Sequence, residues 1–96
     1  MTRDERTTDR SLERVIVDLL DRRGPDSSIC PSDAAREAYA GQDDGWRELM
    51  ERTRQAAWRL ADAGEVEVAR AGRPITRAQA HGPIRIRRAR RRANGS

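Results

Sequence analysis

The sequence predicts an α+β fold of the winged-helix type, with a three-helix helix-turn-helix core and a short three-stranded antiparallel sheet that carries a wing. Three observations lead to this prediction. Residues 7–24 and 46–64 place apolar side chains at helical spacing. Residues 65–70 and 84–87 alternate apolar and charged side chains, as half-buried strands do. The order helix, short strand, helix, tight linker, helix, strand, turn, strand is that of a winged helix.

The length and composition favour one small domain. The chain has 96 residues, of which 35% are hydrophobic, and 14 of these are alanine. A core built from so few large side chains leaves little margin of stability. We expect a flexible N-terminal segment over residues 1–9, the winged-helix domain over 10–88, and a disordered basic C-terminal arm over 89–96.

The first helix is predicted within residues 7–24. Thr7 or Thr8 can cap its start, and Gly24 followed by Pro25 ends it. Its apolar face consists of Leu12, Val15, Ile16, Leu19 and Leu20.

A short strand and a second helix are predicted next. Ser28 to Cys30 has room only for a short strand, and Pro31 suits the first turn of a helix. Either Cys30 or Ser32 would cap that helix, which we expect to end at Gly41. Its apolar face is thin because it consists of Ala34, Ala35, Ala38 and Tyr39.

The third helix, over residues 46–64, has the strongest periodic pattern in the chain, and Gly64 marks its end. Its apolar stripe consists of Trp46, Leu49, Met50, Thr53, Ala56, Ala57 and Leu60.

The two long strands and the wing follow. Val66 and Val68 should face the core from one strand, and Ile84 and Ile86 from the other. The wing is the segment between them, residues 71–83, which begins with the turn AGRP. Within it, the T-x-x-Q spacing of residues 76–79 predicts one helical turn with a capping box.

Three motifs resemble a bacterial family known as "domain of unknown function 3253", whose members are small winged-helix-like proteins. They are CPSDAAR (residues 30–36), GWRELMERTRQAAWRLADAGEVEV (45–68) and GPIRIR (82–87). The resemblance covers roughly residues 12–88, and the basic extension beyond Arg88 departs from the family pattern. It implies the fold. The family has no established activity, so it implies no functional residues.

The positive charge is concentrated at the end of the chain. The formal net charge is +4, and all twenty basic residues are arginine, which we attribute to GC-rich codon usage. Residues 24–45 carry −4 and residues 84–96 carry +6, so without these last thirteen residues the chain would be negative.

This distribution leads to the hypothesis of weak, largely non-specific binding to DNA or RNA through the wing and the C-terminal arm, with phosphate contacts that do not read bases. With six such contacts, the logarithm of the binding constant would fall with the logarithm of the salt concentration with a slope of roughly −5. In the third helix, acidic residues occupy the middle of the exposed face and Trp58 lies on its flank. The candidate contact residues are Arg47, Arg54, Arg70, Arg73, Arg77, Arg85, Arg87, Arg88, Arg90, Arg91 and Arg92.

Three alternatives stay open for these charges. The charged face of the third helix can be a solvated, ion-paired surface, with Trp58 packed against the wing or the first helix. The protein can also be an interaction module that docks a protein partner, or a second copy of itself, through the acidic second helix. A basic terminus is also often a solvated segment without a partner.

The sequence carries no catalytic or cofactor signature. Cys30 and His81 are the only residues of their kinds, so they cannot form a zinc shell, and we expect Cys30 to be structural. Asp43 and Asp44 are typical of a solvated turn. We expect no enzyme activity, no cofactor, no metal, no small-molecule substrate and no membrane segment, and the single cysteine fits a cytoplasmic location. Gly95 and Ser96 resemble a cloning remnant.

Overall fold

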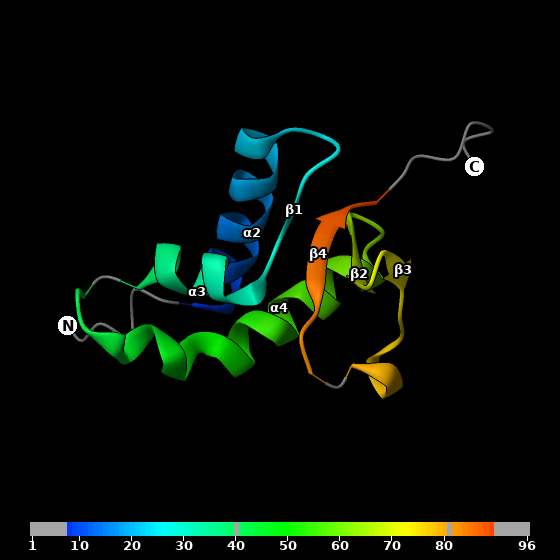
Figure 1. Cartoon of the computed structure of the whole chain (residues 1–96). Coiled ribbons are helices and arrows are strands. Elements are labelled where there is room, and N and C mark those ends of the chain that lie inside the picture. The colour runs from blue at the N-terminus through cyan, green and yellow to red at the C-terminus, as the bar shows by residue number, and fades with distance from the viewer. Residues whose placement is uncertain (1–7, 40, 81, 90–96) are drawn as a thin grey trace.

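The computed structural model describes residues 8–39, 41–80 and 82–89. These residues form the α+β, winged-helix-like arrangement that the sequence predicts (Figure 1). Its helices are α2 (Asp9–Arg23), α3 (Pro31–Ala38) and α4 (Met50–Asp62), with 3-10 helices η1 (Asp44–Leu49) and η2 (Arg77–Gln79). Its strands are β1 (Ser28–Ile29), β2 (Val66–Arg70), β3 (Arg73–Pro74) and β4 (Arg85–Arg88), all antiparallel in the order β1-β4-β2-β3.

Helix α2 has the limits that its sequence predicts. The Thr8 hydroxyl accepts a hydrogen bond from the Ser11 N–H at 3.0 Å, and the Ser11 hydroxyl accepts one from the Thr8 N–H at 2.9 Å. This reciprocal capping fixes the first turn. At the other end Gly24 has a φ of +103°, a conformation that favours glycine and stops the helix.

Helix α3 ends at Ala38, earlier than the predicted end at Gly41, because Tyr39 takes extended backbone angles. The Tyr39 ring lies over the following linker, and its hydroxyl donates a hydrogen bond to Asp43 at 2.5 Å. A Cβ placed on Gly41 or Gly45 would meet this ring at 2.7 Å or 2.1 Å. The linker therefore has glycine at both ends to make room for Tyr39.

The third helix begins differently from the prediction of a single α-helix from Trp46. Asp43 accepts a hydrogen bond from the Gly45 N–H at 3.0 Å and starts a 3-10 helix, η1, and the α-helix proper starts at Met50. A 3-10 turn holds three residues rather than 3.6, so side chains in it shift off the α-helical stripe. Accordingly Trp46 and Met50 are only half-buried, whereas Thr53 is fully buried.

Strand β4 is central in the sheet and pairs with β1 on one side and β2 on the other. Ile86 is opposite Ile29 in β1 and opposite Val68 in β2. The predicted inward direction of Val66, Val68, Ile84 and Ile86 is confirmed, since all four are buried.

The sheet has one strand more than predicted. Arg73 and Pro74, expected in a turn, pair with Arg70 and Ala69 as β3. The turn itself is only Ala71 and Gly72, both with positive φ, as in the tight hairpin turns that match the twist of a sheet. The wing therefore starts as a β-hairpin.

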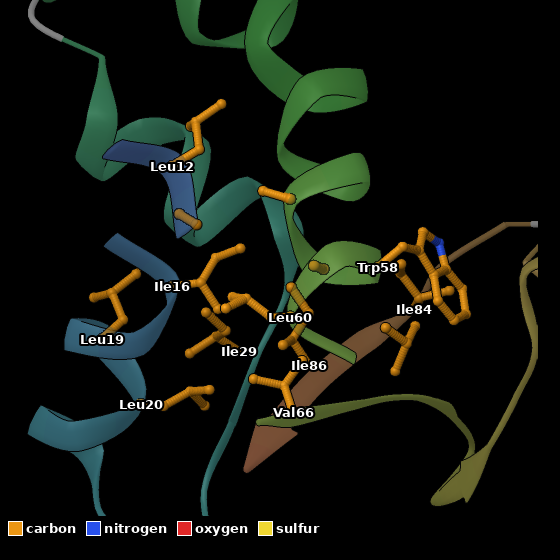
Figure 2. Packing of buried hydrophobic residues seen from close by; sticks show 14 residues of the cluster. Leu12, Ile16, Leu19, Leu20, Ile29, Trp58, Leu60, Val66, Ile84 and Ile86 are labelled. Atoms are coloured by element: carbon orange, nitrogen blue, oxygen red, sulfur yellow. The ribbon is translucent and has the colours of Figure 1, made fainter. Parts of the chain in front are cut away.

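The core lies between α2, α4 and the sheet (Figure 2). Trp58, predicted on an exposed flank of the third helix, is instead 8% exposed and lies beside Ile84 (Figure 2). The alternative that Trp58 packs against another element is therefore confirmed. The largest fully buried side chains are Leu12, Ile16, Leu20, Ile29, Ile86, Val68 and Thr53.

Candidate nucleic-acid interface

Eight of the eleven candidate arginines lie in the described part of the chain, and Arg90, Arg91 and Arg92 lie outside it. Within β4, Arg85 is exposed, while Arg87 and Arg88 are half-buried. Some of the described arginines donate hydrogen bonds to other groups of the protein, and others do not.

Arg87 and Arg88 connect β4 to neighbouring elements. The Arg87 Nε donates to the Glu67 carboxylate of β2 at 2.9 Å, and Arg87 also donates to the Gly72 carbonyl at 3.3 Å. Arg88 forms an ion pair with Asp21 of α2. A phosphate would have to compete with these carboxylates, so this part of the predicted positive edge is neutralised within the fold.

Arg85 and Arg70 are bound to oxygens without formal charge. Arg85 donates to the Ser28 hydroxyl at 3.0 Å and to the Ser28 carbonyl at 2.9 Å. Arg70 donates to the Gln79 carbonyl at 2.9 Å. Arg85 keeps its net positive charge at the surface, and the geometry of both side chains is set by the strands and the wing.

Arg77 fastens the wing to α4. It makes two hydrogen bonds to the Asp62 carboxylate, at 3.2 and 2.7 Å, and its guanidinium carbon lies 5.6 Å from the centre of the Trp58 ring. A two-point bond of this kind fixes orientation as well as charge.

Arg54 and Arg73 have no side-chain hydrogen bond or ion pair among the residues that the structure describes. Arg54 lines a hollow of about 190 Å³ between α4 and the wing, together with Arg77 and the Trp58 ring. Glu51 also lines this hollow and accepts a hydrogen bond from Gln55 at 2.8 Å. Arg73 is exposed in β3, on the wing hairpin. Arg54 is half-buried and Arg73 exposed, and neither charge is paired with a carboxylate in the described part of the chain.

Arg47 lies in a cluster that the sequence did not predict. Its guanidinium carbon is 4.8 Å from the centre of the Trp46 ring, and that of Arg36 from α3 is 4.3 Å from the same centre. Arg36 was overlooked because it is the only basic residue in the acidic segment 24–45. Its convergence with Arg47 depends on how α3 packs against η1, and no spacing in the sequence reports that.

The acidic second helix is largely neutralised. Asp33 pairs with Arg23 at 3.3 Å and Glu37 with Arg22 at 3.2 Å. Partial burial raises the pKa of Asp33, but the hydrogen bonds from Cys30 and the charge of Arg23 outweigh it and hold that pKa below its usual range. The carboxylate therefore stays ionised as part of the cap of α3.

Cys30 is the N-cap residue of α3 and is half-buried. Its N–H donates to the Asp33 carboxylate at 3.1 Å, and its Sγ lies 2.8 Å from the Ser32 hydroxyl. His81, the conceivable base for a thiolate, lies outside the described residues.

The described residues contain no group of three or more histidine, cysteine, aspartate or glutamate side chains that could hold a metal ion. They also contain no helix with the length and apolar character needed to cross a membrane.

Comparison with known proteins agrees with the motifs that the sequence carries. No curated protein gave a match. A family model described as "Protein of unknown function (DUF3253)" matches residues 9–89, which cover all the helices and strands described above. The chain therefore belongs to the DUF3253 family.

Proposed function

We propose that this protein binds nucleic acid, weakly and with little sequence preference, through phosphate contacts along α4, the wing and the C-terminal arm. The observation that carries the proposal is that Arg54 and Arg73 have no side-chain hydrogen bond or ion pair in the described part of the chain, whereas Arg77, Arg87 and Arg88 are paired with carboxylates. Arginine is well suited to this role because its planar guanidinium can donate two parallel hydrogen bonds to one phosphate.

The fold supports this assignment by analogy. In helix-turn-helix proteins the second helix of the motif approaches the duplex while the first crosses the backbone. Here α3 and α4 occupy these two positions, and Arg54 lies on α4. Glu48 of η1 and Glu51 of α4 are exposed and would oppose close entry into a groove. Binding through the phosphates alone fits both facts.

The number of available cations sets the expected salt dependence. If Arg54, Arg73 and the three arginines at 90–92 each neutralise one phosphate, the log-log slope of affinity against salt concentration is roughly −4.5 for duplex DNA. This is slightly shallower than the slope expected from six contacts, because Arg77, Arg87 and Arg88 are occupied by carboxylates.

The test is a fluorescence-anisotropy titration of random-sequence duplex DNA, with single-stranded RNA as a second arm, at several salt concentrations. A chain ending at Ala89 is preferred to one ending at Arg88, because the Ala89 N–H donates to the Glu65 carbonyl at 3.1 Å. This deletion should reduce the slope by about 3. The double variant R54Q/R73Q should reduce it by about 2, again from the number of contacts.

The matched control is Arg14→Gln. Arg14 is exposed on α2, and like Arg54 it has no ion pair among the described residues, so it removes the same charge from another surface. Affinity that does not depend on salt, or equal losses in the control and in R54Q/R73Q, would overturn the proposal. A defined homodimer or protein complex in light scattering, without salt-dependent binding to nucleic acid, would support the interaction module instead.

A further inference from the structure

We infer that Arg36 and Arg47, held against Trp46, form a phosphate-binding site at the turn between α3 and α4. The ligand that this site would take is a phosphate group of a nucleic-acid backbone. The inference rests on the proposed function and extends it to residues at the opposite end of α4 from the wing. Arg36 and Trp46 are added to the candidate interface, and Arg47 would bind phosphate together with Arg36.

The first argument is convergence. Arg36 comes from the last turn of α3 and Arg47 from η1, yet both guanidinium carbons lie within 5 Å of the centre of one indole ring. They are therefore no more than about 9 Å from each other. Two cations from separate elements are thus brought to one place on the surface.

The second argument is the missing counter-charge. Seven arginines in the described part of the chain form an ion pair with a carboxylate, among them Arg22 and Arg23 on the adjacent helix. Neither Arg36 nor Arg47 forms an ion pair or a side-chain hydrogen bond within the described part of the chain, and both are exposed. Two like charges held together without an anion leave a local excess of positive potential, which an incoming phosphate would relieve.

The third argument concerns the donors. A guanidinium over an aromatic ring is held by its flat face, whereas its five N–H groups lie in its plane. Stacking on Trp46 therefore restricts the direction of each guanidinium and leaves these donors at its edge for a phosphate. Restricting a flexible side chain before binding reduces the entropy lost when the ligand is bound.

The last argument is position. Arg47 and Arg54 are seven residues apart, which is roughly 10 Å along the helical segment. A site at Arg36 and Arg47 and a second one at Arg54 would thus contact the backbone at two points along the segment formed by η1 and α4. The linker that leads into η1 is held in place by the hydrogen bond between Tyr39 and Asp43, so the first site has a fixed frame.

The nucleic-acid test uses the full chain and the variants Arg36→Gln and Arg47→Gln, with Arg14→Gln as control. Each of the two variants should reduce the salt slope by about 1 and weaken duplex binding roughly eightfold at 0.1 M salt, the share of one phosphate contact. Trp46→Leu keeps both charges but removes the ring. It should also weaken binding, whereas an effect of net charge alone would leave affinity unchanged. Thermal melts of each variant identify any loss caused by unfolding.

A second measurement does not depend on nucleic acid. The Nε–Hε signals of arginine side chains are followed by NMR while inorganic phosphate is added at constant ionic strength, with chloride as reference. Signals of Arg36 and Arg47 should shift most, and this selectivity should disappear in Trp46→Leu.

The outcomes separate the two proposals. If the chain binds duplex DNA but Arg36→Gln and Arg47→Gln behave like the control, the site is refuted and the proposed function stands. If the chain does not bind nucleic acid, the proposed function fails, and selective phosphate shifts at Arg36 and Arg47 would then support a phosphate site with another source of ligand. Uniform shifts over all arginines would refute the site in either case.

Discussion

Replacing Gly45 by alanine should destabilise the protein through a collision with Tyr39. The added Cβ would lie 2.1 Å from the Tyr39 hydroxyl oxygen and 2.4 Å from Cζ of the same ring, far inside van der Waals contact. Gly45 is not among the glycines with positive φ, so its backbone conformation alone does not demand glycine. The requirement is for space.

The expected loss of unfolding free energy follows from the hydrogen bond that the Tyr39 ring loses when it moves. Moving Tyr39 breaks its hydrogen bond to the Asp43 carboxylate, worth about 1.5–3 kcal/mol for a bond to a charged group. In the opposite direction, replacing glycine by alanine at a position with a compatible backbone stabilises a protein by about 0.4–1 kcal/mol, because the unfolded chain has less conformational entropy. The net loss should be about 1–2 kcal/mol, or a fall in the melting temperature of roughly 4–16 °C for a domain of this size.

The assay is a double-mutant cycle measured by urea unfolding, with the single variants Gly45→Ala and Tyr39→Ala and the pair together. In the absence of the ring, Gly45→Ala should be neutral or slightly stabilising. The coupling energy between the two positions should therefore be about 2 kcal/mol. The same penalty in both backgrounds, or no penalty in the wild-type chain, would refute the explanation.

Three further outcomes follow from the fold. Ile86→Ala should lower the free energy of unfolding by about 2–5 kcal/mol and Ile86→Val by about 0.5–1.5 kcal/mol, because Ile86 is fully buried in the central strand. Urea unfolding with equal m-values would check this, and similar losses for the two variants would contradict it. Thr53→Val keeps the buried volume but removes the hydroxyl that donates to the Leu49 carbonyl at 2.7 Å, so it should cost about 1 kcal/mol, less than Thr53→Ala. Asp33 has a lowered pKa in the folded protein, so its ionised form stabilises the fold above about pH 4, and this contribution is lost as the pH falls through the folded pKa. The difference in unfolding free energy between wild type and Asp33→Ala should therefore be constant from pH 7 to about 5 and shrink below about pH 4. A constant difference down to about pH 2 would contradict the assignment.

The fold was predictable because its signals are local. The stripe of α2 and the alternation of Val66 with Val68 and of Ile84 with Ile86 need only neighbouring residues to be interpreted. The errors are at points where tertiary contacts decide. Arg73 belongs to a strand only because β2 offers a pairing partner, and α3 ends early because Tyr39 packs over the linker rather than continuing the helix.

The candidate interface was predicted less well, for a physical reason. The sequence gives the number of arginines, but whether each is available depends on partners far along the chain. Arg88 meets Asp21 and Arg87 meets Glu67 through the packing of α2 and the register of the sheet. Charge counted by segment therefore overestimated the positive edge formed by β4, and it underestimated Arg36, which sits alone in an acidic segment.

The central place of β4 also dictates when this protein can become folded during synthesis. β1 depends on β4 for pairing, and the β2–β3 hairpin is joined to β1 only through β4; the partners Ser28 and Arg87 are separated by most of the domain. The helices can form as they leave the ribosome, but Ile29 and Val68 have no strand between them until Ile86 has emerged. Folding of the sheet is thus a late step that waits for nearly the whole domain, and such non-local pairing slows it further. Ribosome-bound chains that end before Ile86 would leave Ile29 and Val68, its neighbours in the sheet, uncovered and would need protection from aggregation until the final strand arrives.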